Sequence, residues 1–140
     1  MGKYSKNQGV ALVTGAGQRI GRVIAKSLAC DGWALAIHCN KSTTQAKSLV
    51  RNIVSAGGKA KFIKADLSSE SDTSKLIDQA KSVVGPVTCL INNASVFEHD
   101  DINTSTEVLW NLHMAVNFRA PFILIQKMSE QLPKKTKGNV

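Results

Sequence analysis

The sequence predicts an α/β fold, in which a doubly wound parallel sheet carries helices on both faces. Three observations predict it. Short apolar runs alternate with segments whose apolar residues recur at helical spacing. The connections are only a few residues long, which favours right-handed crossovers between parallel strands. The chain has 140 residues, of which 43% are hydrophobic, and this is enough for one buried core.

Each element has its own signal. Residues 10–13 form a continuous apolar run, typical of a strand that is buried on both faces. Helical spacing begins at Arg19, and Asp31-Gly32 supplies a stop signal. Residues 138–140 are typical of the start of another strand. The remaining predicted elements are a strand at 34–39, a helix at 43–56, a strand at 61–65, a helix at 70–84, a strand at 87–92 and a long helix at 105–131.

Capping pairs mark three of the predicted helix entries. In such a pair, a Ser or Thr hydroxyl and a polar side chain three residues later satisfy free amides of the first helical turn. The pairs are Ser42 with Gln45, Ser69 with Asp72, and Thr104 with Glu107.

Composition and charge narrow the function classes. The net charge is +8, but the basic residues are dispersed, and the one tight group, at 134–137, is typical of a solvated turn. We therefore expect no nucleic-acid partner, and the basicity suits a phosphorylated small molecule instead. No apolar run approaches the length of a membrane span and no hydrophobic signal core begins the chain, so we expect a cytoplasmic protein without membrane contact. Cys30, Cys39 and Cys89 form no CxxC pair, which predicts three buried, reduced thiols and no metal site.

The segment "TGAGQRIG" lies between the first strand and the first helix. Gly15 and Gly17 have no side chains to block a diphosphate, and Gly21 lets the helix pack close to the sheet. The helix amides and dipole then face the anion, and Arg19 adds a positive charge. The spacing matches neither GxGxxG nor GxxxxGK[ST], and the glycines alone also fit a tight turn.

The segment "HCNKS" ends the second strand. A dinucleotide fold that prefers NAD places an Asp or Glu about 20 residues after the glycine loop, but residues 38–42 contain no acid. Lys41 offers a cation where a 2′-phosphate would lie, and Asn40 and Ser42 offer hydrogen-bond donors. NADP(H) is therefore the better-fitting cofactor. The alternatives are that Ser42 caps the next helix and that Lys41 is simply solvated.

Two further segments follow strands. Asp66, in "ADLSS", can accept from the adenine amino group or cap the next helix. Asn92 and Asn93 can hydrogen-bond the backbone on both sides of a crevice and hold the sheet open for a flat ring, although "NNA" alone would be an ordinary turn. Ligands of open parallel sheets bind at the carboxyl ends of the strands, so these segments should converge on one crevice.

Together, "TGAGQRIG", "ADLS", "NNAS" and "VN" at residues 116–117 resemble the ordered motifs of the short-chain dehydrogenase/reductase family, over the whole chain. The resemblance implies a nicotinamide-dependent carbonyl, imine or alkene reductase on a Rossmann fold. It also implies a small-molecule substrate and a homo-tetramer or homo-dimer built through the long helix. The cofactor-binding residues that follow are Gly15, Gly17, Arg19, Ile20, Gly21, His38, Asn40, Lys41, Ser42, Asp66, Leu67, Asn93, Ala94 and Ser95.

One departure from the family is informative. Most members have Gly where this chain has Arg19. The combination of this arginine with the segments "HCNKS" and "NNASVF" resembles the sequences of the pteridine reductase branch. That branch implies that Arg19 contacts diphosphate and pterin, that Ser95 contacts cofactor or substrate, and that Phe97 stacks on the pterin ring. A hydrophobic loop anchor is the alternative for Phe97. The substrate is then a pteridine or dihydrofolate-like ring, with a 3-oxoacyl or other small carbonyl compound as the second possibility and non-catalytic NADP(H) binding as the third.

Asn117 is the candidate catalytic residue. Pro121 cannot donate to its carbonyl, which costs about 3 kcal/mol in a helix interior unless the acceptor is used otherwise. In the family, the matching asparagine helps hold a water in a proton relay. The family's Tyr-x-x-x-Lys pair is missing, and the single tyrosine is Tyr4. We expect a flexible leader at 1–8 and an incomplete NADP(H)-binding domain at 9–140, which holds cofactor without completing the reaction.

Overall fold

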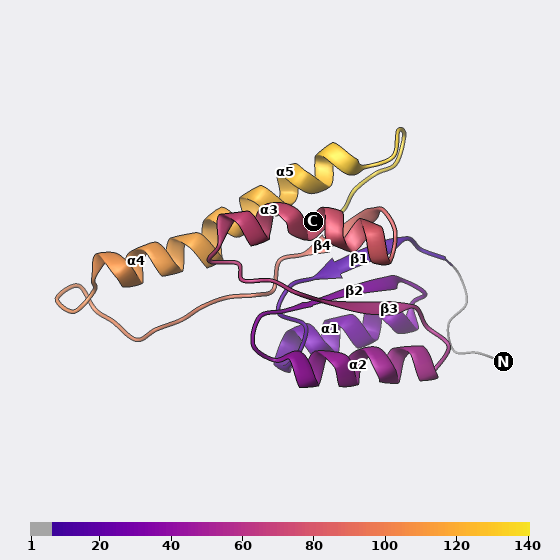
Figure 1. Cartoon of the computed structure of the whole chain (residues 1–140), viewed down its shortest axis with the longest axis horizontal. Helices are drawn as coiled ribbons and strands as arrows, with labels where there is room; N and C mark the ends of the chain where they lie inside the picture. The colour runs from indigo at the N-terminus through magenta and orange to yellow at the C-terminus, as the bar shows by residue number, and fades with distance from the viewer. Residues whose placement is uncertain (1–6) are drawn as a thin grey trace.

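The structure is a computed structural model and describes residues 7–140 (Figure 1). Most of the predicted leader, with Tyr4, lies outside the described residues. The strands are β1 (Val10–Val13), β2 (Ala34–Cys39), β3 (Ala60–Lys64) and β4 (Val87–Ile91). The helices are α1 (Arg19–Cys30), α2 (Thr43–Ser55), α3 (Glu70–Val83), α4 (Glu107–Met114) and α5 (Ala120–Gln131), with a π-helical turn, η1 (Ala115–Arg119), between the last two.

The strands form one parallel sheet in the order β3-β2-β1-β4. Figure 1 shows α1 and α2 on one face of this sheet and α3 with α5 on the other. Side chains alternate along β1: Ala11 and Val13 pack in the core beneath α1 and α2, whereas Leu12 packs in the core beneath α3 and α5. All of β1 is buried. The predicted doubly wound α/β fold is therefore confirmed.

The strand order fixes where a ligand can bind. From β1 the chain crosses to β2 and β3, and it then returns past β1 to form β4. The order therefore reverses between β1 and β4, and the carboxyl ends of these two strands border the crevice of such a sheet. At the edge of the sheet, the amide of Asn139 donates to the Thr88 carbonyl at 3.0 Å, and the amide of Leu90 donates to the Asn139 carbonyl at 2.9 Å. The expected start of another strand at 138–140 is confirmed.

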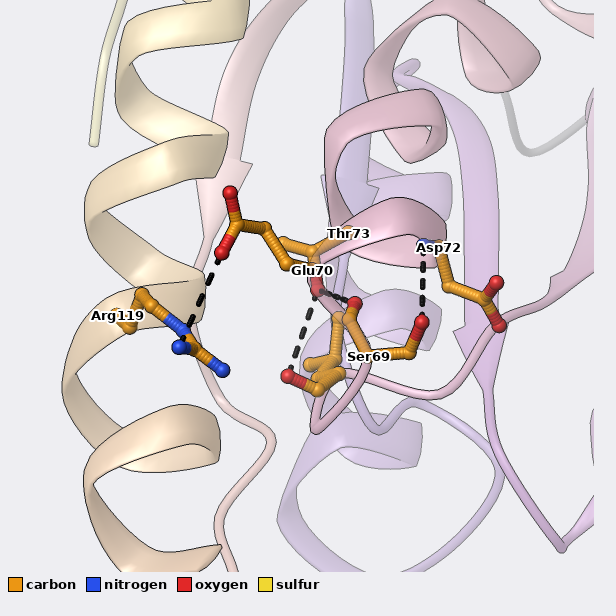
Figure 2. Close-up of polar contacts among 6 residues, drawn as sticks. Ser69, Glu70, Asp72, Thr73 and Arg119 are labelled. Atoms are coloured by element: carbon orange, nitrogen blue, oxygen red, sulfur yellow. Dashed lines mark hydrogen bonds and ion pairs between the residues drawn. The ribbon is translucent and has the colours of Figure 1, made fainter. Parts of the chain in front are cut away.

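The capping prediction for α3 is confirmed for Ser69 but not for Asp72, whose carboxylate accepts from the Asp66 amide at 3.1 Å, and the capping prediction for α2 is wrong. The Asp72 amide donates to the Ser69 hydroxyl at 3.3 Å at the start of α3, and Thr73 Oγ1 donates to the Ser69 carbonyl at 2.8 Å (Figure 2). Ser42 precedes α2 but its side chain makes no cap hydrogen bond. Its hydroxyl lies instead against Gly17 of the glycine loop.

The entry to the long helix also differs from the prediction. Thr104 does not cap it, because the Thr104 hydroxyl accepts from the Asp101 amide at 2.9 Å and the Asp101 carboxylate accepts from the Thr104 amide at 3.0 Å. This local turn competes with the helix. The cap is Thr106, whose hydroxyl accepts from the Leu109 amide at 3.2 Å, so the helix begins at Glu107.

The long helix contains a widened turn just before Pro121. Residues 115–119 are π-helical, and the Ala120 amide donates to the Ala115 carbonyl, five residues back. Pro121 follows in the first turn of α5. A π-turn adds a residue to the turn, so the helix continues past the proline without an α-helical bond from position 121. The missing donor at Pro121 is therefore accommodated beside a π-turn.

Two expectations about apolar segments need correction. The helix Glu107–Gln131 is long and apolar enough, by length and composition alone, to cross a membrane, although core helices pass the same test. Its α5 part packs Ala120, Leu124 and Met128 in the core. Cys30 is exposed rather than buried, because it is turned about 100° away from the buried Ala29. Cys39 and Cys89 are buried, and burial raises the pKa of both thiols.

Candidate functional site

A hydrogen-bonded clasp joins the ends of β1 and β4. Asn93 Nδ2 donates to the carbonyls of Thr14 at 2.9 Å and Gly15 at 3.3 Å. In return, the Thr14 hydroxyl accepts from the amides of Asn93 and Ala94, each at 3.0 Å. The clasp fixes the glycine loop against the segment after β4. The expected amide contact across the crevice is therefore confirmed for Asn93.

The glycine loop approaches this clasp too closely for side chains. Gly15 has a φ of 64°, in the left-handed region that glycine adopts without strain. A Cβ on Gly21 would lie 2.5 Å from Asn93 Nδ2 and 2.6 Å from the Gly15 carbonyl oxygen. Only glycine therefore allows α1 to begin this close to the sheet.

Arg19 is an exposed residue in a left-handed conformation at the first position of α1. Its φ is 49°, which costs a residue with a Cβ roughly 1–2 kcal/mol. Strained backbone of this kind concentrates at ligand sites, where the surrounding structure holds it in place. The strain therefore supports a functional role for the guanidinium at this loop.

His38 lies under the loop rather than on an open surface, since its side chain is 1% exposed. Its Nδ1 accepts from the Gly15 amide at 3.1 Å, and its Nε2 lies 3.1 Å from the Ala65 carbonyl oxygen. The carbonyl of the same residue accepts from the Ala16 amide at 2.9 Å. Burial lowers the pKa of the imidazole below its usual value. Both ring nitrogens are thus used by the backbone.

A groove of about 800 Å³ opens at the carboxyl ends of the strands. Most of the predicted site residues meet there, and those that line it are Gly15, Arg19, Ile20, His38, Asn40, Lys41, Ser42, Asp66, Leu67, Asn93, Ala94 and Ser95. Gly17, in the loop itself, and Gly21, in the first turn of α1, are buried. The structure therefore brings four separate sequence segments to one crevice, as predicted.

Sequence reasoning missed other residues of the groove, namely Gln18, Gln45, Ser68, Val96, Glu98, Leu112 and Val116. Gln18, Ser68, Val96 and Val116 lie inside the quoted motifs but were given no role there, and Glu98 directly follows "NNASVF". Leu112 precedes Val116 by four residues, so helical spacing places both on one face of the long helix.

The groove wall carries opposite charges at Lys41 and Asp66. Asp66 Oδ1 accepts from the Ser68 amide at 2.9 Å and the Ser68 hydroxyl at 2.8 Å. These bonds, followed by the positive charge of Lys41, lower the pKa of the Asp66 carboxyl. Ser69 caps α3, so the capping alternative for Asp66 is wrong. The adenine contact stays a prediction.

Asn117 and Phe97 do not line the groove. Asn117 Oδ1 accepts from the Val96 amide and its Nδ2 donates to the Val96 carbonyl, both at 2.9 Å. The side chain therefore clamps the loop after β4 to the long helix, and a role for Asn117 in a proton relay stays a prediction. Phe97 is 81% exposed and stacks on His113, with ring centroids 6.5 Å apart. Its expected stacking on a pterin ring stays a prediction.

A polar link also ties the long helix to α3. Arg119, the last residue of η1, reaches Glu70 at the start of α3 with an N–O distance of 3.9 Å (Figure 2). Both side chains are exposed, so the pair contributes about 1 kcal/mol at most. Within residues 7–140, no group of His, Cys, Asp and Glu side chains is arranged to hold a metal ion.

The fold and the groove define a doubly wound α/β domain with its ligand site at the strand-order reversal. The short chain dehydrogenase family profile matches residues 9–140, and the chain belongs to this family. The chain is 39% identical over 101 residues to the short-chain dehydrogenase/reductase homolog YusS of Bacillus subtilis, covering 70% of this chain and 93% of that protein. It is 30% identical over 130 residues to the 3-oxoacyl-[acyl-carrier-protein] reductase FabG of Staphylococcus epidermidis, covering 93% of this chain and 53% of FabG.

Solved structures agree with this assignment. FolM alternative dihydrofolate reductase 1 from Brucella canis, complexed with NADP, matches with a TM-score of 0.90 and 37% identity, covering 94% of this chain and 54% of FolM. A blue fluorescent protein from a metagenomic library, in complex with NADPH, matches with a TM-score of 0.87 and 33% identity, covering 91% of this chain and 52% of that one. The chain thus spans about half the length of FabG and of both solved structures.

Proposed function

We propose that this chain is the cofactor-binding part of an NADP(H)-dependent short-chain reductase. The observation that carries the proposal is the groove wall after β2, which presents Lys41 and no carboxylate from residues 38–42. A carboxylate at this place would accept from the ribose hydroxyls of NAD, whereas a cation suits a 2′-phosphate. The NADP and NADPH bound in the matching structures support the same choice.

The residues of the groove fit the phosphates of such a cofactor. The glycine loop leaves its backbone open, and the amides and positive dipole end of α1 favour an anion. Arg19 adds charge beside the diphosphate. Lys41, with Asn40 and Ser42, would hold the 2′-phosphate. When bound, the cofactor supplies a hydride, while these side chains bind and orient it.

The two ring systems of the cofactor would occupy opposite ends of the groove. Asp66 and Leu67 border the adenine end after β3. Asn93, Ala94 and Ser95 border the nicotinamide end after β4, where the clasp between β1 and β4 keeps the sheet edge open. The groove volume of about 800 Å³ lies within the range of ligand pockets.

Charge reversal at Lys41 tests the cofactor choice. We expect Lys41→Glu to reduce the preference for NADPH over NADH about tenfold or more, because a hydrogen bond to a charged group contributes about 1.5–3 kcal/mol. Titration calorimetry with both cofactors measures this preference. Lys61→Glu is the matched control, since Lys61 is exposed on β3 and outside the groove. An unchanged preference in Lys41→Glu, or an equal loss in both variants, contradicts the proposal.

The proposed substrate is a pteridine or dihydrofolate-like ring. Two observations support it: the left-handed Arg19 at the groove, and the 37% identity to FolM alternative dihydrofolate reductase. The similarity to FabG supports a second candidate, a 3-oxoacyl compound. Within the proposal, Ser95 contacts cofactor or substrate. Phe97 would have to leave His113 to stack on a bound ring.

Tryptophan fluorescence separates these candidates. The chain has two tryptophans. Trp33 lines a cleft that includes the start of β1, and Trp110 lies on α4. In the Trp33→Phe variant loaded with NADP⁺, we expect an added pterin to quench the fluorescence of Trp110 by energy transfer. A 3-oxoacyl thioester added afterwards should leave that quenching unchanged. Displacement of the pterin by the thioester, or thioester binding without any quenching by the pterin, favours the carbonyl substrate. NADP⁺ binding without either ligand favours a non-catalytic binding role.

We further propose a cytoplasmic homo-oligomer that associates through the long helix. Trp110, Met114, Phe118 and Phe122 are exposed at intervals of four residues. The last three line a hollow of about 620 Å³ together with Asn111, Ala115 and Arg119. A second copy would cover this exposed apolar stripe.

A further inference from the structure

The buried side chain of His38 connects the glycine loop after β1 with the segment that follows β3. His38 lies in β2, and its ring accepts from the Gly15 amide while its carbonyl accepts from the Ala16 amide. Its other ring nitrogen contacts the carbonyl of Ala65, directly after β3. One buried side chain therefore sets the distance between the loop after β1 and the segment that carries Asp66.

The partners of the ring allow only one protonation state. The Ala65 carbonyl can only accept, so Nε2 must carry a hydrogen. The Gly15 amide can only donate, so Nδ1 must be bare. A protonated imidazole would point an N–H at the N–H of Gly15, which replaces a hydrogen bond with a repulsion. The observed loop thus requires the neutral Nε2–H tautomer.

We propose that His38 is a positioning residue that holds the glycine loop in its NADP(H)-binding form only while the ring is neutral, so that cofactor affinity falls in acid. The inference rests on the proposed function and adds a pH-dependent control to the same site. His38 acts through Gly15 and needs no contact with the cofactor.

The surroundings of the ring set the direction of the effect. Burial is the main cause that lowers the pKa of His38, and it outweighs the Ala65 carbonyl and the charge of Asp66, which favour protonation. Directly after β1, the facing residues Thr14 and Gly15 do not titrate. Titratable neighbours by sequence and strand register are Cys39 beside it on β2, Lys41 after that strand, and Lys64, which pairs with Cys39 on β3.

Because the folded pKa is depressed, the unfolded chain binds the proton more readily. The contribution of His38 to stability is therefore complete above the ordinary histidine pKa. It is lost as the pH falls through the folded value. The intact loop is the neutral-pH form, and acid releases Gly15.

The first measurement compares NADP⁺ affinity in wild type and His38→Asn between pH 8 and pH 5. The asparagine keeps a side-chain acceptor for Gly15 but does not titrate. The 2′-phosphate also titrates near pH 6, but it does so equally in both proteins. Below the pKa of His38, we expect each further drop of one pH unit to lower the wild-type affinity by up to about tenfold more than it lowers the affinity of the variant. His99→Asn, a loop variant outside the groove, should follow the wild type.

The second measurement needs no ligand and no variant. Nitrogen NMR of the ligand-free wild type should show the His38 ring protonated at Nε2 and bare at Nδ1 at pH 7.5, and the Gly15 amide should lose hydrogen-exchange protection as His38 titrates. A bare Nε2, or a Gly15 amide insensitive to that titration, overturns the proposal even if His38→Asn fails to fold. Identical pH profiles in wild type and variant also overturn it. If NADP⁺ does not bind at any pH, the proposed function is refuted, and so is the effect of His38 on cofactor affinity. The NMR result still decides whether His38 holds the loop.

Discussion

Replacing Gly21 with alanine is expected to destabilise the fold by about 2–4 kcal/mol and to abolish measurable NADP(H) binding. The added Cβ would meet the Gly15 carbonyl oxygen at 2.6 Å and the Ala16 Cα at 3.0 Å, and both belong to the backbone. It would also lie 2.5 Å from Asn93 Nδ2, so relief of the clash breaks the clasp between β1 and β4. Chemical denaturation measures the loss of stability, and calorimetry measures the loss of affinity.

Gly138→Ala provides the matched control. A Cβ at Gly138 would meet Leu132 Cδ1 and Met128 Cε, each at 2.9 Å. These atoms are the ends of flexible side chains and can move at little cost, so we expect a change below about 1 kcal/mol. If the two variants were equally stable, α1 would have to be able to shift away from the sheet. That result would contradict the close packing that we infer from the clasp.

The second large effect is expected for Asn93→Asp. The substitution keeps the shape of the side chain but removes the amide that donates to the Thr14 and Gly15 carbonyls. A carboxylate would then face two carbonyl oxygens without a donor, which costs about 3 kcal/mol or more in a partly buried place. Thermal and chemical unfolding at pH 7.5 measure the loss.

The pH dependence of that variant identifies the cause. The two carbonyls should raise the pKa of the introduced carboxyl in the folded state, since only the protonated acid can donate to them. Its destabilising effect should therefore shrink as the pH falls through that raised value. Asn52→Asp, on the exposed surface of α2, is the control and should change stability by less than about 1 kcal/mol. A loss at position 93 that is independent of pH would point to packing rather than charge.

The arrangement of strands and helices could be predicted from the sequence because local signals agreed with the tertiary structure. The apolar run at 10–13 is buried on both faces, and the stop at Asp31-Gly32 ends α1 as expected. The convergence of the glycine loop with Lys41, Asp66 and Asn93 also followed, since parallel strands place their carboxyl ends at one edge.

Other features depend on contacts that a linear pattern does not contain. Thr104 carries a good capping signal, but the carboxylate of Asp101 takes its amide and forms a turn instead. Ser42 carries the same signal, yet its hydroxyl lies against the loop before α1. The position of Phe97 could not be predicted from the sequence. Its ring stacks on His113 of α4, and the start of α4 depends on the turn between Asp101 and Thr104. The tautomer of His38 likewise depends on two partners, Gly15 after β1 and Ala65 after β3, that lie far from it in the sequence.

The π-turn in the long helix constrains how the length of this segment can vary. One residue rotates an α-helix by about 100°. The residues of η1 therefore set the rotational phase of α5, which directs Ala120, Leu124 and Met128 into the core. A one-residue insertion between Ala115 and Arg119 would turn these three side chains away from the core, while the same insertion in the loop before Glu107 leaves the phase of α5 unchanged.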